Sequence, residues 1–276
     1  RDLPSFPTRR SSDLIAEANL INVAAGLSIM GLVPFASTFA MFASGRAWEQ
    51  VRNTLGYPHL NVKIGATHGG ISVGEDGASH QCCEDFALMR VIPDMLVCCP
   101  CDGHEMALAV EALINYKGPA YLRLERPATE VITDEIEGYS FELGKGVTLR
   151  DGSDVTIIAT GINVPMAVKA ADLLAESGIF ARVIDMHTIK PLDEELVLKA
   201  AKETGCIVTS EEHSVIGGLG GAVSEFLSGT YPVPVVRHGV DDVFGRSGTY
   251  AAVLEYFGIT PEGIAEKAKQ ALAMKK

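Results

Sequence analysis

Long apolar runs are missing from this chain of 276 residues, although 47% of its residues are hydrophobic. Gly, Pro, Ser or Asn interrupts every apolar stretch before it reaches the roughly 18 residues of a membrane span, so no membrane protein is predicted. An excess of basic residues is also missing, because 23 Lys and Arg face 35 Asp and Glu and give a formal net charge of −12. A chain this acidic is not expected to bind nucleic acid or an anionic membrane surface.

The cysteines lack the spacing of a metal site or a disulfide framework. Five of the six lie within 20 residues, and they do not make the two spaced pairs of a zinc ribbon. Neighbouring cysteines cannot easily connect distant segments of a chain. We therefore expect reduced thiols in a cytoplasmic protein, and no metal ligands in this chain. The six are Cys82, Cys83, Cys98, Cys99, Cys101 and Cys206.

The first 14 residues, RDLPSFPTRRSSDL, carry neither a helix nor a strand pattern. The segment has no apolar core of a signal peptide, and its Asp2 and Asp13 argue against a transit peptide. Its SFPTRRSSDL part looks like a sequencing adapter translated in one frame. We therefore expect residues 1–14 to be a non-native or disordered leader, with the natural chain entering near Ile15.

From Ile15 onward, helical and strand patterns alternate along the chain. Helices are expected at 16–31, 39–57, 82–92, 102–116, 164–178, 191–205, 217–229 and 260–276. Strands are expected at 33–38, 61–67, 95–100, 120–126, 154–161, 181–189, 206–213 and 233–240. Such alternation predicts an α/β fold with parallel sheets covered on both faces.

Two α/β domains follow from where this alternation pauses. Residues 15–132 form the first, residues 133–152 read as a polar linker with a hairpin element, and residues 153–276 form the second. At the start of the helix predicted over 102–116, Asp102 is an N-cap candidate and Glu105 stands at capping-box spacing.

The Gly-rich loop HGGISVGEDGASHQ is the strongest candidate for a functional site. Its glycines permit tight turns and close ligand approach, and it gathers His68, Glu75, Asp76 and His80 directly after a predicted strand. Ligands of parallel sheets bind beyond the carboxyl ends of the strands. The alternative is a surface loop whose charges are simply solvated.

Glu17 stands at the start of an otherwise apolar helix pattern. If buried, its carboxyl could hold or donate a proton near neutral pH. The alternative, which the sequence by itself favours, is an exposed first-turn glutamate beside the helix dipole. Phe39 and Phe42 lie three residues apart on one helical face, a spacing more common in a core than in a cofactor site.

Other motifs give weaker signals. Arg123 and Arg126 lie at the end of a predicted strand, where either could bind a phosphate or pair with Glu125 or Glu130. The GGLGG run before a helix lacks the spacing of a dinucleotide-binding fingerprint, so tight packing is the default interpretation. His213 is a lone histidine near a strand end and is interpreted as structural.

Taken together, these segments resemble the C-terminal half of transketolase, and more narrowly the split transketolases, in which two chains make one enzyme. The resemblance covers essentially all of residues 15–276. It rests on IAEANL, STFAMFASGRAWEQVRN, THGGISVGEDGASHQ, YLRLERP, DMHTIKPLD, SEEHSVIGGLG and FGRSG. It implies an N-terminally truncated thiamine diphosphate pyrimidine-binding domain, which lacks the first strand and helix that normally precede Glu17, followed by a transketolase C-terminal domain.

The resemblance reverses the interpretation of Glu17, which would correspond to the glutamate that hydrogen-bonds the aminopyrimidine nitrogen of thiamine diphosphate. Phe39 and Phe42 would match the aromatic pocket that packs the pyrimidine ring. Gly45 stands where full-length enzymes often place a further aromatic residue. Glu17 is thus expected to be both catalytic and cofactor-binding.

Four further residues would face the substrate. His68 and His80 would match substrate-facing histidines with catalytic roles, Asp76 the carboxylate that hydrogen-bonds a substrate hydroxyl, and Arg126 the arginine that binds a sugar phosphate. The implied reaction transfers a two-carbon ketol unit from a ketose phosphate to an aldose phosphate in carbohydrate metabolism.

The motif that binds the cofactor's diphosphate and metal in this family, a GDG sequence with a following Asn, is missing from the chain. We therefore expect an N-terminal partner subunit to hold the diphosphate with Mg²⁺ or Ca²⁺, in a dimer of such pairs with the active site at their interface. We expect the chain on its own not to turn over.

Three alternatives remain. Deoxyxylulose-phosphate synthase has a similar loop, but with an acidic residue and Arg at the positions of Thr67 and His68. The beta chain of pyruvate-type dehydrogenases lacks the GEDG pattern. A non-catalytic structural subunit is the third alternative, and the retention of Glu17 and the loop residues argues against it.

Overall fold

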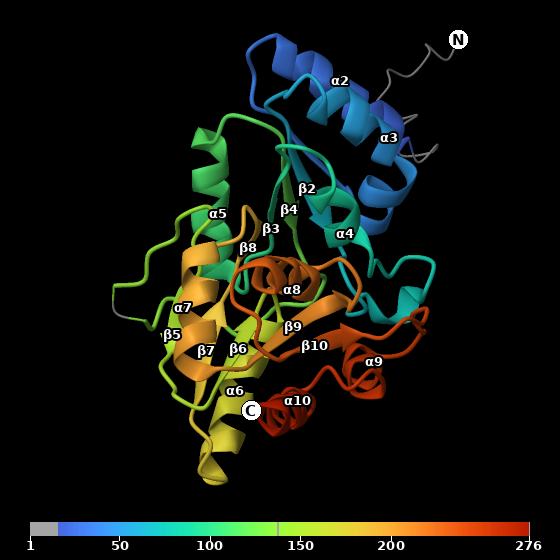
Figure 1. The fold of residues 1–276 in the computed structure, drawn as a ribbon. Coiled ribbons are helices and arrows are strands. Elements are labelled where there is room, and N and C mark those ends of the chain that lie inside the picture. The colour runs from blue at the N-terminus through green and yellow to red at the C-terminus, as the bar shows by residue number, and fades with distance from the viewer. Residues whose placement is uncertain (1–15, 137, 276) are drawn as a thin grey trace, which may run out of the picture.

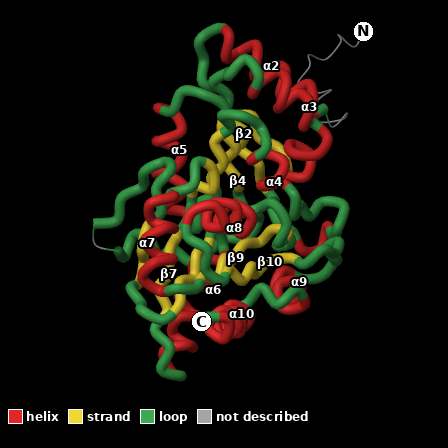
Figure 2. The backbone as a smooth tube through the Cα atoms, in the orientation of Figure 1, coloured by secondary structure: helices red, strands yellow, loops and turns green. Residues whose placement is uncertain are grey.

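The structure is a computed structural model that describes residues 16–136 and 138–275. The expected leader, residues 1–14, lies outside these ranges. The described chain forms two five-stranded sheets, each with helices against both faces (Figure 1). Figure 2 shows the strands lying inside the molecule, between helices and loops. The expectation of two α/β domains is confirmed, although each sheet also has one antiparallel strand at its edge.

The first sheet has the strand order β1-β2-β4-β3-β8. Strands β1 to β4 run parallel, and β8 pairs antiparallel with β3. Every residue of β3 and β4 is buried, as expected for strands covered on both faces. The strands are β1 (Phe35–Phe39), β2 (Lys63–Thr67), β3 (Leu96–Cys98), β4 (Ala120–Arg123) and β8 (Thr188–Lys190).

The second sheet has the order β10-β9-β6-β7-β5, with β5 antiparallel at one edge. Successive side chains of its strands enter opposite cores: Ile157 packs with α6 and α10, and Ile158 packs with α7 and α8. The strands are β5 (Val147–Arg150), β6 (Val155–Ala159), β7 (Ala181–Asp185), β9 (Ile207–Ser214) and β10 (Val235–Val240).

The helices of the first domain include two π-helical turns, η1 and η2, and a 3₁₀ turn, η3. They are α2 (Glu17–Ile29), η1 (Phe42–Arg46), α3 (Trp48–Gln50), η2 (Val51–Gly56), η3 (Gly74–Asp76), α4 (Asp85–Arg90) and α5 (Gly103–Asn115). Those of the second domain are α6 (Asn163–Glu176), α7 (Glu194–Thr204), α8 (Leu219–Thr230), α9 (Tyr250–Tyr256) and α10 (Pro261–Met274). None of the helices in the described residues is both long and apolar enough to cross a bilayer.

The strand predicted over 181–189 is in fact divided between the two sheets. β7 belongs to the second sheet, whereas β8 crosses to the first and pairs with β3. The backbone N–H of Cys99 donates to the carbonyl of His187 at the crossing point, 2.8 Å away. The two domains therefore share a sheet, which no local pattern could indicate.

Smaller differences concern helix ends and short elements. The helix predicted from Pro191 begins at Glu194, because the Asp193 side chain accepts a hydrogen bond from the backbone N–H of Leu196. The helix predicted over 39–57 is wrong at its start, because Phe39 ends strand β1 and does not share a helical face with Phe42, and the rest is broken into η1, α3 and η2. The short helix α9 was not predicted. Asp102 caps α5 as expected, but Glu105 accepts from the backbone of Cys101 rather than that of Asp102.

Candidate functional site

Aromatic and imidazole rings gather at the carboxyl ends of β1 and β2. Phe39 ends β1, and His68 follows β2 with its ring stacked on Phe39, at 3.8 Å between centroids. Phe42 lies nearly parallel to Phe39 at 6.0 Å, and His80 meets it edge-on at 5.4 Å. Since β1 and β2 are parallel neighbours, their ends bring together residues about 30 positions apart.

Glu17 is buried beside this ring cluster. Its residue is only 5% exposed, so the alternative of an exposed first-turn glutamate is wrong. The Arg46 guanidinium donates to Glu17 Oε2 at 3.0 Å and also lies over the Phe42 ring, 4.7 Å from its centroid. Arg46 therefore connects the carboxylate to the aromatic rings.

Charged groups form the other side of the site. Arg126 Nη1 donates to the carbonyl of Val73 at 2.5 Å and lies 3.8 Å from Asp76 Oδ2. The Arg126 side chain is 42% exposed, so an anion from solvent can reach it. Burial, and then the nearby Arg126 charge, lower the pKa of His68, while Asp76 opposes them. His68 is consequently neutral near pH 7.

The second domain holds the Gly-rich loop in place. Ser72 donates to both carboxylate oxygens of Glu212, from its backbone N–H and from its hydroxyl, the latter at 3.2 Å. Arg123 Nη2 donates to the carbonyl of Glu212 at 2.8 Å. Burial raises the pKa of Glu212 to about 8, although the Arg123 charge opposes this shift.

Glycine is required where the loop passes these two side chains. A Cβ at Gly69 would stand 2.0 Å from Arg123 Nε, and a Cβ at Gly70 would stand 2.3 Å from Glu212 Cδ. Gly70 also has a φ of +71°, which favours glycine. The close approach fixes the path of the loop that carries His68.

The structure settles three weaker sequence signals. Arg123 does not face a ligand site: it is 1% exposed and its Nε lies 3.4 Å from Asp85 Oδ2. The GGLGG segment packs tightly, because Glu211 accepts from the backbone N–H groups of Leu219 and Gly220 at the start of α8, each at 2.7 Å. His213 is fully buried and stacks on Phe86, in agreement with a structural role.

Sequence reasoning missed Arg46 and Glu212. Arg46 lies four residues after Phe42, one helical turn away, so its spacing was a usable signal. Glu212 contacts Ser72 across 140 positions of sequence, and no local pattern marks such a contact.

The residues of this site fit the pyrimidine part of thiamine diphosphate by their chemistry. A buried carboxylate can hydrogen-bond a ring nitrogen, and Phe39 and Phe42 offer apolar surface for a flat ring. Full-length enzymes often have an aromatic residue at the position of Gly45. Here a Cβ at Gly45 would stand 2.8 Å from Met41 Cε, so the methionine side chain occupies the space beside this position.

Comparisons with known proteins match both domains. Residues 6–131 match the family described as transketolase, pyrimidine binding domain. Residues 144–264 match transketolase, C-terminal domain.

Individual relatives agree. A transketolase C-terminal section of Methanocaldococcus jannaschii is 51% identical over 263 residues, covering 95% of this chain and 82% of that protein. A 6-deoxy-6-sulfo-D-fructose transketolase subunit of a Clostridium species is 45% identical over 266 residues, covering 96% and 82%. A solved structure described as a split-gene transketolase, an inactive β4 tetramer, superimposes with a TM-score of 0.88 at 50% identity, covering 95% of this chain and 83% of that one.

Proposed function

The chain belongs to the transketolase family, as the C-terminal section of a thiamine diphosphate-dependent enzyme, and from this we propose the roles of its residues and its partner. The proposed complex transfers a two-carbon ketol unit from a ketose phosphate to an aldose phosphate. The observation that carries this proposal is the meeting of Glu17, the aromatic rings and the His68–Asp76–Arg126 group at one edge of the first sheet.

Glu17 and the two phenylalanines would hold the coenzyme's ring. When bound, thiamine diphosphate supplies the carbon nucleophile and the electron sink that ketol transfer needs. The Glu17 carboxyl would hydrogen-bond the aminopyrimidine nitrogen and hold a proton there. Phe39 and Phe42 would pack the ring and exclude water from it, which strengthens that hydrogen bond.

The charged side of the site would bind the sugar. Arg126 would pair with the sugar phosphate, since a guanidinium matches phosphate oxygens bidentately. Asp76 would accept a hydrogen bond from a substrate hydroxyl. His68 and His80 would contact hydroxyls near the reacting carbons, and the neutral His68 can accept a proton from one of them.

An N-terminal partner subunit would complete the site. The chain has no GDG motif, so we assign the diphosphate and its Mg²⁺ or Ca²⁺ to the partner. We propose a dimer of such pairs, with each active site between two chains. A cytoplasmic location is supported by six cysteines that are all unpaired and buried.

Reconstitution tests this proposal. The chain is coexpressed with an N-terminal transketolase subunit and supplied with thiamine diphosphate and Mg²⁺. The assay follows transfer from xylulose 5-phosphate to ribose 5-phosphate, and a parallel assay follows decarboxylation of pyruvate. We expect ketol transfer by the two chains together and none by either chain alone.

Two outcomes would contradict the proposal. Pyruvate decarboxylation without ketol transfer would assign the chain to the synthase or dehydrogenase alternative. Ketol transfer by the purified single chain would show that the partner is not needed.

A further inference from the structure

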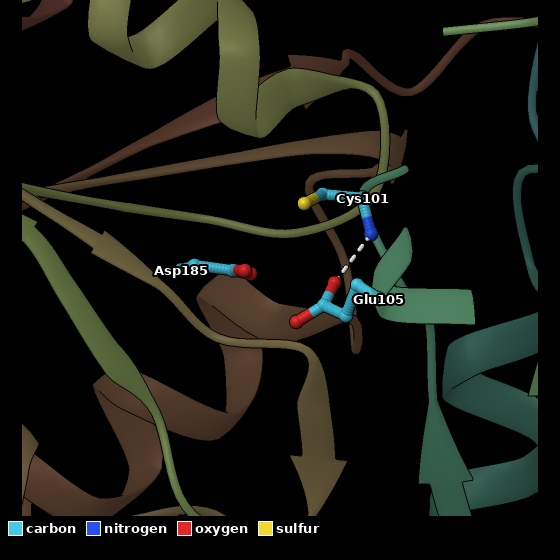
Figure 3. Close-up of side chains that lie close together, drawn as sticks. All are labelled: Cys101, Glu105 and Asp185. Atoms are coloured by element: carbon cyan, nitrogen blue, oxygen red, sulfur yellow. Dashed lines mark hydrogen bonds between the residues drawn. The ribbon is translucent and has the colours of Figure 1, made fainter. Parts of the chain in front are cut away.

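Away from the ring cluster, three potential metal ligands meet where the two domains touch. Cys101 precedes α5, Glu105 lies in its first turn, and Asp185 ends β7 of the second sheet (Figure 3). One potential ligand atom from each, a sulfur and two carboxylate oxygens, lies within 4.8 Å of the others. All three residues are at most 1% exposed, so the cluster is closed to solvent.

The hydrogen bonds of the cluster are unevenly distributed. Glu105 accepts from the backbone N–H of Cys101 at 2.6 Å and from the hydroxyl of Tyr139. Asp185, in contrast, has no hydrogen-bond partner for either oxygen within the described residues. Figure 3 shows its carboxylate pointing toward Glu105.

A carboxylate buried without a hydrogen-bond donor needs a proton or a positive charge beside it. Removing an ionised carboxylate from water without a donor or a counter-charge is costly, and a second carboxylate beside it adds repulsion. In the described part of the chain, no Lys or Arg pairs with Asp185 or Glu105. Either a cation or a proton must therefore lie between the two acids.

The chemistry of the cluster favours a cation. A thiol is a poor ligand for Mg²⁺ or Ca²⁺, which prefer oxygen alone, but sulfur together with carboxylate oxygen suits Zn²⁺. Binding would release the protons of Cys101 and Asp185 to solvent and form one sulfur and two oxygen bonds to the metal. Tyr139, through its bond to Glu105, would orient that ligand from outside.

We propose that Cys101, Glu105 and Asp185 form a binding site for Zn²⁺ that joins the first domain to the second. The ligands come from both domains, because Cys101 and Glu105 belong to the first and Asp185 to the second. The ion would stabilise the contact between the domains. The site shares no residue with the ring cluster, so it does not depend on the ketol-transfer proposal.

Metal analysis of the full chain tests the site directly. The reduced protein is refolded with Zn²⁺, desalted and analysed for zinc, and expected to retain about one equivalent per chain. Refolding with Co²⁺ should give a thiolate-to-cobalt charge-transfer band. Zinc should raise the melting temperature by about 5 °C or more relative to the metal-free chain.

Matched variants separate this site from adventitious binding. Cys101→Ser and Asp185→Asn are expected to lose the zinc and the zinc-dependent shift, and Cys101→Ser to lose the cobalt band. Cys206→Ser, at the buried thiol directly before β9, and Asp134→Asn, at an exposed acid, should retain them.

The wild-type measurement keeps the test independent of how the variants fold. A folded wild-type chain that retains no zinc and gives no cobalt band would overturn the proposal, and the two acids would then share a proton. Zinc retained equally by Cys101→Ser and Asp185→Asn would overturn it as well, because the ion would lie elsewhere.

Discussion

Glu17 has two neighbours that decide its chemistry, the Arg46 guanidinium and, through it, the Phe42 ring. The same glutamate could have been a solvated first-turn residue, and its position in sequence does not distinguish the two. Burial beside an arginine fixes the direction in which its carboxyl group points. The proposed role of Glu17 in α2 therefore depends on Arg46, a residue of the separate element η1.

Replacing Glu17 by glutamine removes the proton-holding carboxyl while keeping its shape. We expect Glu17→Gln to lower kcat of the reconstituted enzyme by about 100-fold to 10,000-fold, the range typical of a lost general acid–base group. Steady-state ketol transfer measures this. Glu176→Gln, at an exposed position of α6, serves as control. Full activity of the Glu17 variant would remove the basis of the proposed chemistry.

The pH dependence of the reaction tests the environment of His68. Burial, followed by the Arg126 charge, lowers the pKa of His68 below its usual value of 6.5. If neutral His68 is the active form, kcat/KM falls on the acid side only below about pH 6.5. Arg126→Met removes the neighbouring cation, so the pKa of His68 rises and the acid limb moves to higher pH.

Arg52→Met, at an exposed position of η2, is the control for that experiment and should leave the limb in place. The pH at which kcat/KM falls on the acid side is compared between the variants and the wild type. The absolute value of kcat/KM is not used, because Arg126→Met also weakens phosphate binding and thus lowers it at every pH. A limb that stays fixed in Arg126→Met would mean that His68 does not control it.

One buried lysine connects separate elements of the first domain. Lys63 on β2 donates from Nζ to Asn61 Oδ1, and to the carbonyls of Tyr116 and Gly118, all within 2.9 Å. Burial lowers the pKa of Lys63 to about 8. The ammonium thus satisfies the C-terminal end of α5 and the turn that leads into β4.

Methionine at this position keeps the apolar stem but removes every donor. Because buried acceptors left without a partner cost about 1–3 kcal/mol each, we expect Lys63→Met to reduce the free energy of unfolding by about 2–4 kcal/mol. Urea denaturation of the chain measures it. Lys117→Met, at an exposed position of the same turn, should change stability by less than about 0.5 kcal/mol. Equal effects of the two would contradict this account.

The whole molecule exposes an apolar face on α2 and the segment that follows it. Val23 is 52%, Leu27 42%, Ile29 71% and Met30 80% exposed. An exposed apolar face of this kind marks a contact surface, and we expect the partner subunit to cover it. In Figure 1, α2 lies at the end of the molecule opposite α10, away from the contact between the two domains.

Charges placed on this face should impair assembly without unfolding the chain. Val23 and Leu27 are one turn apart on α2, and burying each contributes about 1.5–3 kcal/mol. The double variant Val23→Lys with Leu27→Lys is therefore expected to weaken binding of the partner subunit about 100-fold or more. Titration calorimetry measures the affinity, and thermal unfolding of the isolated chain monitors its fold.

A matched control for this experiment is Ile114→Lys, because Ile114 is 53% exposed on α5. That variant should bind the partner as the wild type does. If the α2 double variant also binds like the wild type, the partner covers a different surface.

Local patterns in the sequence determined the elements, the two α/β domains and the loop that carries His68 and Asp76, because periodicity, caps and glycine positions act over a few residues. Resemblance to a family supplied the roles of Glu17 and Arg126. The tertiary structure alone decided that β8 crosses to the first sheet, that Glu212 holds Ser72, and that Cys101 and Glu105 face Asp185. These contacts join residues from 80 to 140 positions apart. Their strength depends on burial between the two domains, and no local sequence pattern records that burial.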